Sequence, residues 1–301
     1  MNRRLGTYVN GNTVVAIYND GSKERYLPND EPAAPDFPES IDLKITDKCD
    51  LGCAMCHECS TPDGDHADLS DPILNTLHPH TELAIGGGNP LEHPDLPDFL
   101  RRTHSQGVIC NVTVNAVHFM KNIDYLRSLV DECLVYGLGI SIPSVVPEGF
   151  FDAVQEFPNA VIHTIAGITP IDVFRSLADR NLNLLILGYK YKGRGENLMN
   201  RYPIDIYTNI FELEKNVMTL PQHFRNVGFD NLAVKQLVMK DKLADEQWDN
   251  LYLGDDGEFT MYIDLVKRMA AKSSTHEAFH FSTDSIDQLF HQIKTEGDRL
   301  K

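Results

Sequence analysis

The sequence predicts an α/β fold in which parallel strands alternate with covering helices. Between residues 41 and 190, short apolar runs alternate with segments of helical periodicity, and each run ends at a loop rich in Gly, Cys, Asn or Pro. Alternation of this kind is typical of a parallel sheet with helices outside it. A closed eight-unit barrel needs about 250 residues, so six units in roughly 150 residues predict an open, partial (β/α)6 barrel.

Each unit is assigned from its apolar pattern and its boundary residues. The segments expected to be strands are 41–45, 82–85, 108–114, 134–142, 160–165 and 184–187. The segments expected to be helices are 69–77, 96–106, 123–130, 150–156 and 171–180. Ser70 or Asp68 is suited to cap the first helix, and Gly107 is suited to end the second.

The segments on either side of this core predict three parts of the chain. Residues 1–38 form an N-terminal β-hairpin and linker, because Asn-Gly and Asn-Asp-Gly turns separate β-branched runs between residues 8 and 27. Residues 39–192 form the partial barrel, and residues 193–301 form an α+β extension that closes its open side and shapes the substrate site. Within the extension we expect a flexible loop at 193–195, helices at 211–218, 243–251 and 284–294, and a strand at 259–266, while 232–238 stays unassigned.

Composition and charge exclude several classes of function. The formal net charge is −17, which disfavours a long nucleic acid as partner and suits a basic peptide or protein. No apolar run reaches about 18 residues, so no membrane span is expected. The first residues carry no signal-peptide core and the six cysteines are not spaced as a disulfide framework, so we expect a cytoplasmic protein.

Three cysteines stand close together immediately after the first predicted strand. Cys49, Cys53 and Cys56 have the spacing Cys-x3-Cys-x2-Cys. Clustered thiolates select zinc or iron–sulfur. A structural zinc site needs four closed ligands, whereas a 4Fe–4S cluster held by three thiolates leaves one iron open to a small molecule. The loop therefore predicts an iron–sulfur site with an open position.

At these cysteines the sequence resembles the radical S-adenosylmethionine (SAM) superfamily, in which the same motif follows the first strand of a partial (β/α)6 barrel. The resemblance implies a 4Fe–4S cluster whose open iron chelates the amino and carboxylate groups of SAM. One electron, from a reductant such as flavodoxin or ferredoxin, then cleaves SAM to a 5′-deoxyadenosyl radical that takes hydrogen from a substrate. Met55 stands where the family usually has an aromatic residue beside the adenine.

The loop after the second strand resembles the Gly-Gly-Glu-Pro motif that binds the SAM amino group in this family. Gly87, Gly88 and Pro90 match it, and Asn89 replaces the usual Glu. An Asn side chain keeps a carbonyl acceptor and loses the negative charge. We therefore expect the ammonium contact to be made largely by backbone carbonyls.

Residues at the ends of the later strands are the remaining expected contacts. By the resemblance, Asn115 and Ser141 bind the ribose or the methionine carboxylate, and Gly167 lies beside the adenine. Lys190 is suited to meet a carboxylate or phosphate. The candidates for a catalytic side chain are Tyr189, as a radical relay or a stacking group, and Cys59, as a hydrogen-atom donor or an incidental thiol.

Three interpretations of the function remain open at this point. The first is a SAM-cleaving enzyme with one cluster, since no cysteine follows Cys133 to hold another, and its favoured substrate is a peptide or protein. The second is a non-enzymatic zinc or iron–sulfur module for regulation or electron transfer, in which Cys59 or His57 is the fourth ligand. The third, motivated by Asn89, is a protein that binds SAM without cleaving it.

Overall fold

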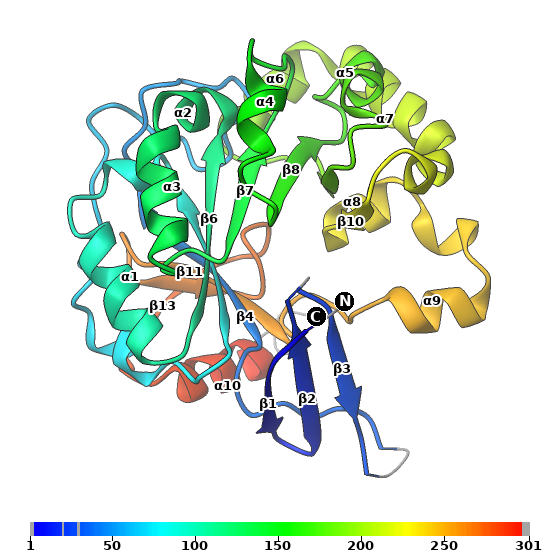
Figure 1. Cartoon of the computed structure of the whole chain (residues 1–301). Coiled ribbons are helices and arrows are strands. Elements are labelled where there is room, and N and C mark those ends of the chain that lie inside the picture. Colours follow the sequence, from blue (N-terminus) through cyan, green and yellow to red (C-terminus); the bar gives the residue numbers. More distant parts are fainter. Residues whose placement is uncertain (1–2, 20, 29–30, 297–301) are drawn as a thin grey trace.

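One large sheet organises the chain. The computed structural model describes residues 3–19, 21–28 and 31–296, and its ten-stranded sheet has the order β10-β9-β8-β7-β6-β5-β4-β11-β12-β13 (Figure 1). The strands are β4 (Ser40–Thr46), β5 (Glu82–Gly87), β6 (Ile109–Asn115), β7 (Gly137–Ser141), β8 (Ala160–Ile165), β9 (Asn183–Leu187), β10 (Asn226–Phe229), β11 (Thr260–Asp264), β12 (Met269–Ala271) and β13 (Phe279–His280).

The six predicted strands of the core are confirmed. Strands β4 to β9 lie side by side in chain order, and every neighbouring pair is parallel. Two strands from the C-terminal third extend this parallel set, because β10 pairs with β9 and β11 pairs with β4. Among the described strands β10 and β11 do not pair with each other, so the sheet stays open.

Helices after β5 to β8 cover one face of the sheet. They are α1 (Leu96–Ser105), α2 (Ala116–Lys121), α3 (Ile123–Asp131), α4 (Phe150–Val154) and α5 (Ile171–Leu177). Helix α1 shows why the sequence folds this way: Leu96, Phe99, Leu100 and Thr103 share one buried stripe, and Gly107 follows at φ +76°. These helices and the sheet bury one continuous apolar core.

The face of the sheet away from these helices is only partly buried. In β6, Cys110, Val112 and Val114 are buried in the core, while the alternate residues, Asn111 and Thr113 among them, keep partial exposure. The same alternation of buried and half-buried residues runs through β5, β8 and β9. Because successive strand residues point to opposite faces, this inner face is open to solvent.

Two predictions in the core are corrected. The expected helix at 69–77 is only a short 3-10 helix, η1 (Pro72–Thr76), and Asp71 caps it in place of Ser70 or Asp68. Proline at its first position removes one backbone donor and favours a start at that point. The fourth strand begins at Gly137, because the apolar residues at 134 and 135 pack into the core before the strand starts.

The C-terminal third differs more from the prediction. The expected flexible loop at 193–195 contains the start of α6 (Arg194–Arg201), and the expected helix at 211–218 is the end of α7 (Pro203–Asn216) followed by η3 (Val217–Gln222). The unassigned segment falls in α8 (Asn231–Gln236), and η4 (Met239–Lys242) follows it. The other expected elements are present as α9 (Asp245–Leu251), β11 and α10 (Ile286–Glu296).

The N-terminal segment is a three-stranded antiparallel sheet, one strand more than the expected hairpin. Its strands are β1 (Arg4–Asn10), β2 (Thr13–Tyr18) and β3 (Lys23–Tyr26), and Figure 1 shows them beside the large sheet. Ion pairs attach β3 to the main sheet, since Lys23 lies 2.6 Å from Glu82 and Arg25 lies 2.8 Å from Glu39. Within the described residues, no helix has the length and apolar character needed to cross a membrane.

The close packing around Gly139 gives a test of the inner face. A Cβ on Gly139 would lie 2.5 Å from Cε1 of His163 and 2.8 Å from Oγ1 of Thr113, whereas a Cβ on Gly86 would meet nothing within 4 Å. Gly139→Ala should therefore lower the free energy of unfolding by about 1–3 kcal/mol, and the control Gly86→Ala should change it by no more than about 0.5 kcal/mol. Urea denaturation measures both.

A second background tests the cause. In His163→Ala the ring that the new methyl group meets is gone, so Gly139→Ala should cost clearly less there than in the parent protein. Equal costs in the two backgrounds would contradict the predicted packing of His163 over Gly139.

Candidate functional site

The cysteine loop follows β4 at the carboxyl end of the parallel strands, and backbone hydrogen bonds close it at its base. The Cys49 N–H donates to the Thr61 carbonyl at 2.9 Å, and the Thr61 N–H donates to the Asp47 carbonyl at 3.0 Å. Within the loop, Cys49, Cys53 and Cys56 are half-buried. The carboxyl ends of parallel strands are where active sites of such folds gather.

Arg194, the first residue of α6, which follows β9, contacts the cysteine loop from the far end of the row of core strands. Its Nε donates to the Cys53 carbonyl at 2.9 Å, its Nη1 donates to the Ser60 carbonyl at 3.1 Å, and its backbone N–H donates to the Cys56 carbonyl at 3.0 Å. Two loop carbonyls accept hydrogen bonds from the Arg194 guanidinium and a third accepts from its backbone N–H. A residue from the sixth unit therefore stabilises the loop conformation.

The three thiols lie close enough to act on one another electrostatically. Burial raises the pKa of Cys49, and the charges of Cys53 and Cys56 raise it further. In the described part of the chain, the one group of three potential ligands with atoms within 4.8 Å of one another is Cys49, Asp50 and His118, not the three cysteines. Three thiolates on one zinc ion would sit about 3.8 Å apart. The three cysteine sulfurs are therefore not gathered as the ligands of a single zinc ion.

Of the two residues considered as a fourth zinc ligand, His57 is engaged elsewhere. The His57 Nε2 lies 3.1 Å from Glu58 Oε1 and 3.1 Å from Lys190 Nζ. Cys59 is exposed, and its sulfur would lie 2.9 Å from a Cβ on Gly193, which has φ +60°. Because Gly193 has no side chain, its loop can pack closely against the cysteine loop. The contacts of His57 with Glu58 and Lys190 weigh against its use as a fourth zinc ligand.

The glycine loop after β5 is bonded to the chain that leads into the cysteine loop. The Gly88 N–H donates to the Thr46 carbonyl and the Asn89 N–H donates to the Lys48 carbonyl, both at 2.7 Å. A Cβ on Gly88 would lie 2.2 Å from the Lys48 oxygen. Only glycine permits this approach.

The side chain of Asn89 has a local structural role. It is 4% exposed, its Oδ1 accepts from the Leu91 N–H at 3.3 Å, and its Nδ2 donates to Glu92 Oε1 at 3.0 Å. It therefore caps η2 (Pro90–Glu92). This engagement agrees with the expectation that any contact to SAM from this loop comes from the backbone, which stays a prediction.

Asn115 and Ser141 lie in one row at the carboxyl end of neighbouring strands. The strand register pairs Asn115 with Ser141, and Ser141 with His163 of β8. Asn115 Oδ1 accepts from the Val117 N–H at 2.9 Å and so caps α2. Both predicted residues are half-buried at the open inner face, where their SAM contacts remain a prediction.

His163 completes that row, and sequence reasoning missed it. Burial lowers its pKa to about 4, so the imidazole is neutral at ordinary pH and offers both a donor and an acceptor. The available signal was the period of two in the fifth strand, which puts His163 on the opposite face from the core residues Ala160 and Ile162.

The other predicted residues have identifiable partners. Gly167, at φ +83°, packs under Ile206 of α7. Tyr189 is buried, and its hydroxyl donates to the Gly195 carbonyl at 2.5 Å. Lys190 Nζ donates to Ser274 Oγ at 2.8 Å, and Met55 is half-buried in the cysteine loop. Lys190 is the one of these four that presents a charge beside the cysteine loop.

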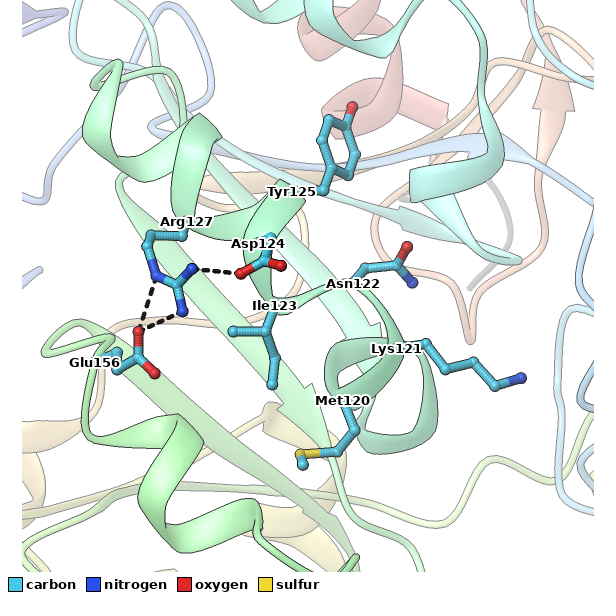
Figure 2. Close-up of a pocket in the computed structure, with 8 residues that line it drawn as sticks. All are labelled: Met120, Lys121, Asn122, Ile123, Asp124, Tyr125, Arg127 and Glu156. Carbon is cyan, nitrogen blue, oxygen red and sulfur yellow. Dashed lines mark hydrogen bonds and ion pairs between the residues drawn. The ribbon is translucent and has the colours of Figure 1, made fainter.

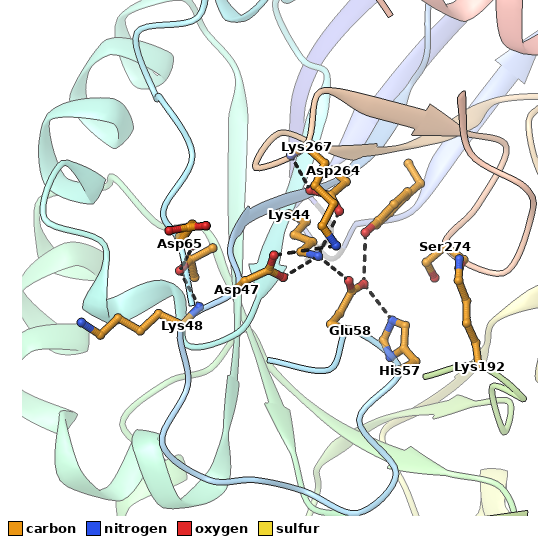
Figure 3. A network of polar contacts seen from close by, with 12 residues as sticks. Lys44, Asp47, Lys48, His57, Glu58, Asp65, Lys192, Asp264, Lys267 and Ser274 are labelled. Carbon is orange, nitrogen blue, oxygen red and sulfur yellow. Dashed lines mark hydrogen bonds and ion pairs between the residues drawn. The ribbon is translucent and has the colours of Figure 1, made fainter. Parts of the chain in front are cut away.

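A buried ammonium lies beneath the cysteine loop, and this cluster was also missed. Lys44 Nζ lies 2.6 Å from Asp47, 2.8 Å from Glu58 and 2.9 Å from Asp264 (Figure 3). The Tyr262 hydroxyl donates to Glu58 at 3.1 Å. No sequence signal was available, because Asp264 stands 220 residues from Lys44 and only the pairing of β11 with β4 brings them together.

Charge compensation outweighs burial at Lys44. Burial alone would lower its pKa, but the attraction of Glu58 and the hydrogen bonds to the three carboxylates raise the pKa above its ordinary value. A lysine pKa raised by folding stabilises the protein at neutral pH, and that contribution is lost only as the pH rises through the raised value.

A separate cavity of about 510 Å³ lies where α2 meets α3 (Figure 2). Arg127 crosses it to bond Asp124 and Glu156. Its lining contains no predicted site residue, although Lys121 at its rim lies 3.8 Å from Asp50 of the cysteine loop. The cavity is therefore not part of the inner-face site.

Comparison with known proteins gives a likeness in structure alone. No known sequence family and no curated protein matches the chain. SuiB of Streptococcus suis bound to its precursor peptide SuiA is 14% identical, with a TM-score of 0.50, and the match covers 85% of this chain and 61% of SuiB. Another SuiB structure is 12% identical, with a TM-score of 0.50 and coverage of 91% and 80%.

These comparisons establish the fold of the chain. It spans about three-fifths of the length of the peptide-bound SuiB chain. The likeness to SuiB shows a mixed α/β fold around a large, open parallel sheet, and the predicted radical SAM chemistry stays a prediction.

Replacing Lys44 tests the buried network. Lys44→Met leaves three carboxylates around an apolar side chain, and we expect the free energy of unfolding to fall by about 3 kcal/mol. Carboxylates without their cation take up protons more readily, so the deficit should shrink when urea denaturation is run at about pH 5 instead of neutral pH.

The control is Lys121→Met, which removes another lysine beside the cysteine loop. That side chain is 60% exposed, so the change should be within about 0.5 kcal/mol. A Lys44→Met deficit no larger than the control's, or one that grows at low pH, would refute the assigned role.

Proposed function

We propose that the chain is a radical SAM enzyme that holds one 4Fe–4S cluster on Cys49, Cys53 and Cys56 and abstracts hydrogen from a peptide. One observation carries the proposal: three half-buried thiols, not gathered within 4.8 Å of one another, in a hydrogen-bonded loop at the carboxyl end of β4. The likeness to SuiB supports it, because the two chains share a fold over 85% of this chain.

The residues present fit this cofactor. When bound, the cluster supplies the electron that cleaves SAM, and the resulting 5′-deoxyadenosyl radical takes hydrogen from the substrate. The chain's own part is positioning: Arg194 and the Thr61 carbonyl hold the loop, and the backbone of Gly87 and Gly88 lies next to it. An external one-electron reductant such as flavodoxin or ferredoxin is required.

The inner face of the sheet is the proposed place for SAM and substrate. Asn115, Ser141 and His163 form a polar row there, and Lys190 stands beside the loop. Neutral amide, hydroxyl and imidazole groups are suited to hydrogen-bond ribose or peptide groups. Tyr189 is fully bonded within the protein, so of the two catalytic candidates Cys59, with its exposed thiol, is the more accessible.

A peptide is the proposed substrate because SuiB, with the same fold, is bound to its precursor peptide SuiA. The half-buried, solvent-accessible inner face is compatible with an extended ligand. The net charge of −17 favours a partner with basic residues.

The first experiment tests SAM cleavage. The protein is reconstituted anaerobically with iron and sulfide, dithionite and SAM are added, and 5′-deoxyadenosine is measured. Cys53→Ala should lose the cluster absorbance and at least about 100-fold of the product, because a ligand is missing. Cys133→Ala, which removes an exposed thiol at the end of α3, should retain both.

A parent protein that forms no cluster after bound zinc has been removed with a chelator would overturn the proposal. A full cluster without any 5′-deoxyadenosine, even after a peptide fraction is added, would favour SAM binding without cleavage.

The second experiment tests the substrate class. A deuterated cell extract is divided by size into a peptide fraction and a small-molecule fraction, and each is added to the reconstituted enzyme. Deuterium in 5′-deoxyadenosine should come from the peptide fraction, since the abstracted atom is transferred to that product. Deuterium arising solely from the small-molecule fraction would exclude a peptide as substrate.

A further inference from the structure

A buried histidine reaches the cysteine loop from a helix that the cluster motif does not include. His118 of α2 is 3% exposed, and its Nε2 lies 2.6 Å from Asp50 Oδ1. Asp50 directly follows Cys49, and the ligand atoms of Cys49, Asp50 and His118 all lie within 4.8 Å of one another. The proposed cluster uses Cys49 alone of these three.

The surroundings keep the imidazole in this place. Helix α2 begins at the Asn115 cap, at the end of β6. His118 and Phe119 are buried on its inner side, and the Asn122 side chain donates to the His118 carbonyl at 2.8 Å. The Asp50 side chain is 52% exposed, so it can move to accept a ligand while His118 stays fixed.

One thiolate, one carboxylate and one imidazole form a ligand set that zinc accepts. Zinc bonds of about 2.0–2.3 Å place tetrahedral ligand atoms roughly 3.3–3.8 Å apart, so closure from separations of at most 4.8 Å needs shifts of no more than about 1.5 Å between ligand atoms. A Cys49 thiolate and the Asp50 carboxylate together neutralise a divalent cation. Three protein ligands leave the fourth position to water, as in open zinc sites.

We propose that Cys49, Asp50 and His118 bind one divalent cation of the zinc type when the cluster is absent. On binding, the Cys49 thiol releases its proton to solvent, and the proton on His118 Nε2 passes to Nδ1 by exchange with solvent. The bond between His118 and Asp50 is then replaced by two bonds to the metal. The cation site itself does not depend on the proposed function. Its consequence does: Cys49 cannot serve both metals, so zinc competes with assembly of the 4Fe–4S cluster.

The local charges predict how the affinity should respond. Lys121 Nζ lies 3.8 Å from Asp50 Oδ2, one helical turn after His118. Its positive charge opposes a cation bound at Asp50, so Lys121→Met should tighten binding by about two- to fivefold at low salt. If Asp50 only anchored α2 through His118, Lys121→Met would not increase the affinity for the cation.

The experiment uses the full chain purified without a cluster, titrated with Co²⁺ as a spectroscopic probe and then with Zn²⁺ against a chromophoric chelator. The intensity of the thiolate-to-cobalt absorption counts the sulfur ligands. We expect one tightly bound ion with a single thiolate. Cys53→Ala/Cys56→Ala should keep that spectrum, while Asp50→Ala and His118→Asn should weaken binding at least tenfold.

The matched control is Asp179→Ala, which breaks the surface pair in which His223 Nδ1 lies 2.9 Å from Asp179 without a nearby cysteine; it should leave the affinity unchanged. A three-thiolate cobalt spectrum that is lost in the Cys53→Ala/Cys56→Ala protein, or an affinity indifferent to Asp50→Ala, would overturn the proposal.

The outcome is separable from that of the proposed function. Iron–sulfide reconstitution of Asp50→Ala is measured in the same preparation, and it should proceed with added zinc that blocks the parent protein. Equal inhibition by zinc in both proteins would show that the cation binds elsewhere and refute the competition, whether or not SAM is cleaved.

Discussion

The buried ammonium of Lys44 is the constraint on which the site depends. A charge removed from water is costly unless it is paired and hydrogen-bonded, and Lys44 meets that requirement with carboxylates from three separate parts of the chain. Glu58 belongs to the cysteine loop, and Asp264 belongs to β11. The interaction therefore joins the first core strand, the loop and the C-terminal third into one arrangement.

Backbone contacts then align the second strand with the same loop. The missing side chains of Gly87 and Gly88 allow the carbonyls of Thr46 and Lys48 to approach within distances that a Cβ would block. Arg194 supplies the third attachment. The cysteine loop, with its three half-buried thiols, has little apolar area to bury. Its conformation therefore depends on the hydrogen bonds at its ends and on the Arg194 guanidinium.

The open inner face follows from the same architecture. Apolar residues on one side of β6 and β8 pack against helices, while polar residues on the other side stay in contact with solvent. The glycines of β7 make room for neighbouring side chains, and His163 occupies the space over Gly139. A ligand in this position meets neutral donors and acceptors across three strands, with charge concentrated near the cysteine loop.

Much of the core could be predicted because its signals are local. Alternating apolar runs and helical stripes placed β4 to β9 and the main helices within a few residues, and glycine and cysteine spacing located the two loops of the site. The errors have local causes too: Pro72 shortened the first helix to η1, and buried residues just before Gly137 looked like part of β7. The buried residues before Gly137 are apolar like those of a buried strand, but they pack into the core without belonging to β7.

The amino-acid sequence by itself determined the strand–helix alternation, the three thiols and the glycine loop, since each depends on residues near one another along the chain. The tertiary structure decided which partners those residues meet. His57 came to lie beside Lys190, and His118 came to lie beside Asp50. The residues in each of these contacts are far apart along the chain. The strand register and the open edge of the sheet bring them together, and no local sequence pattern encodes that arrangement.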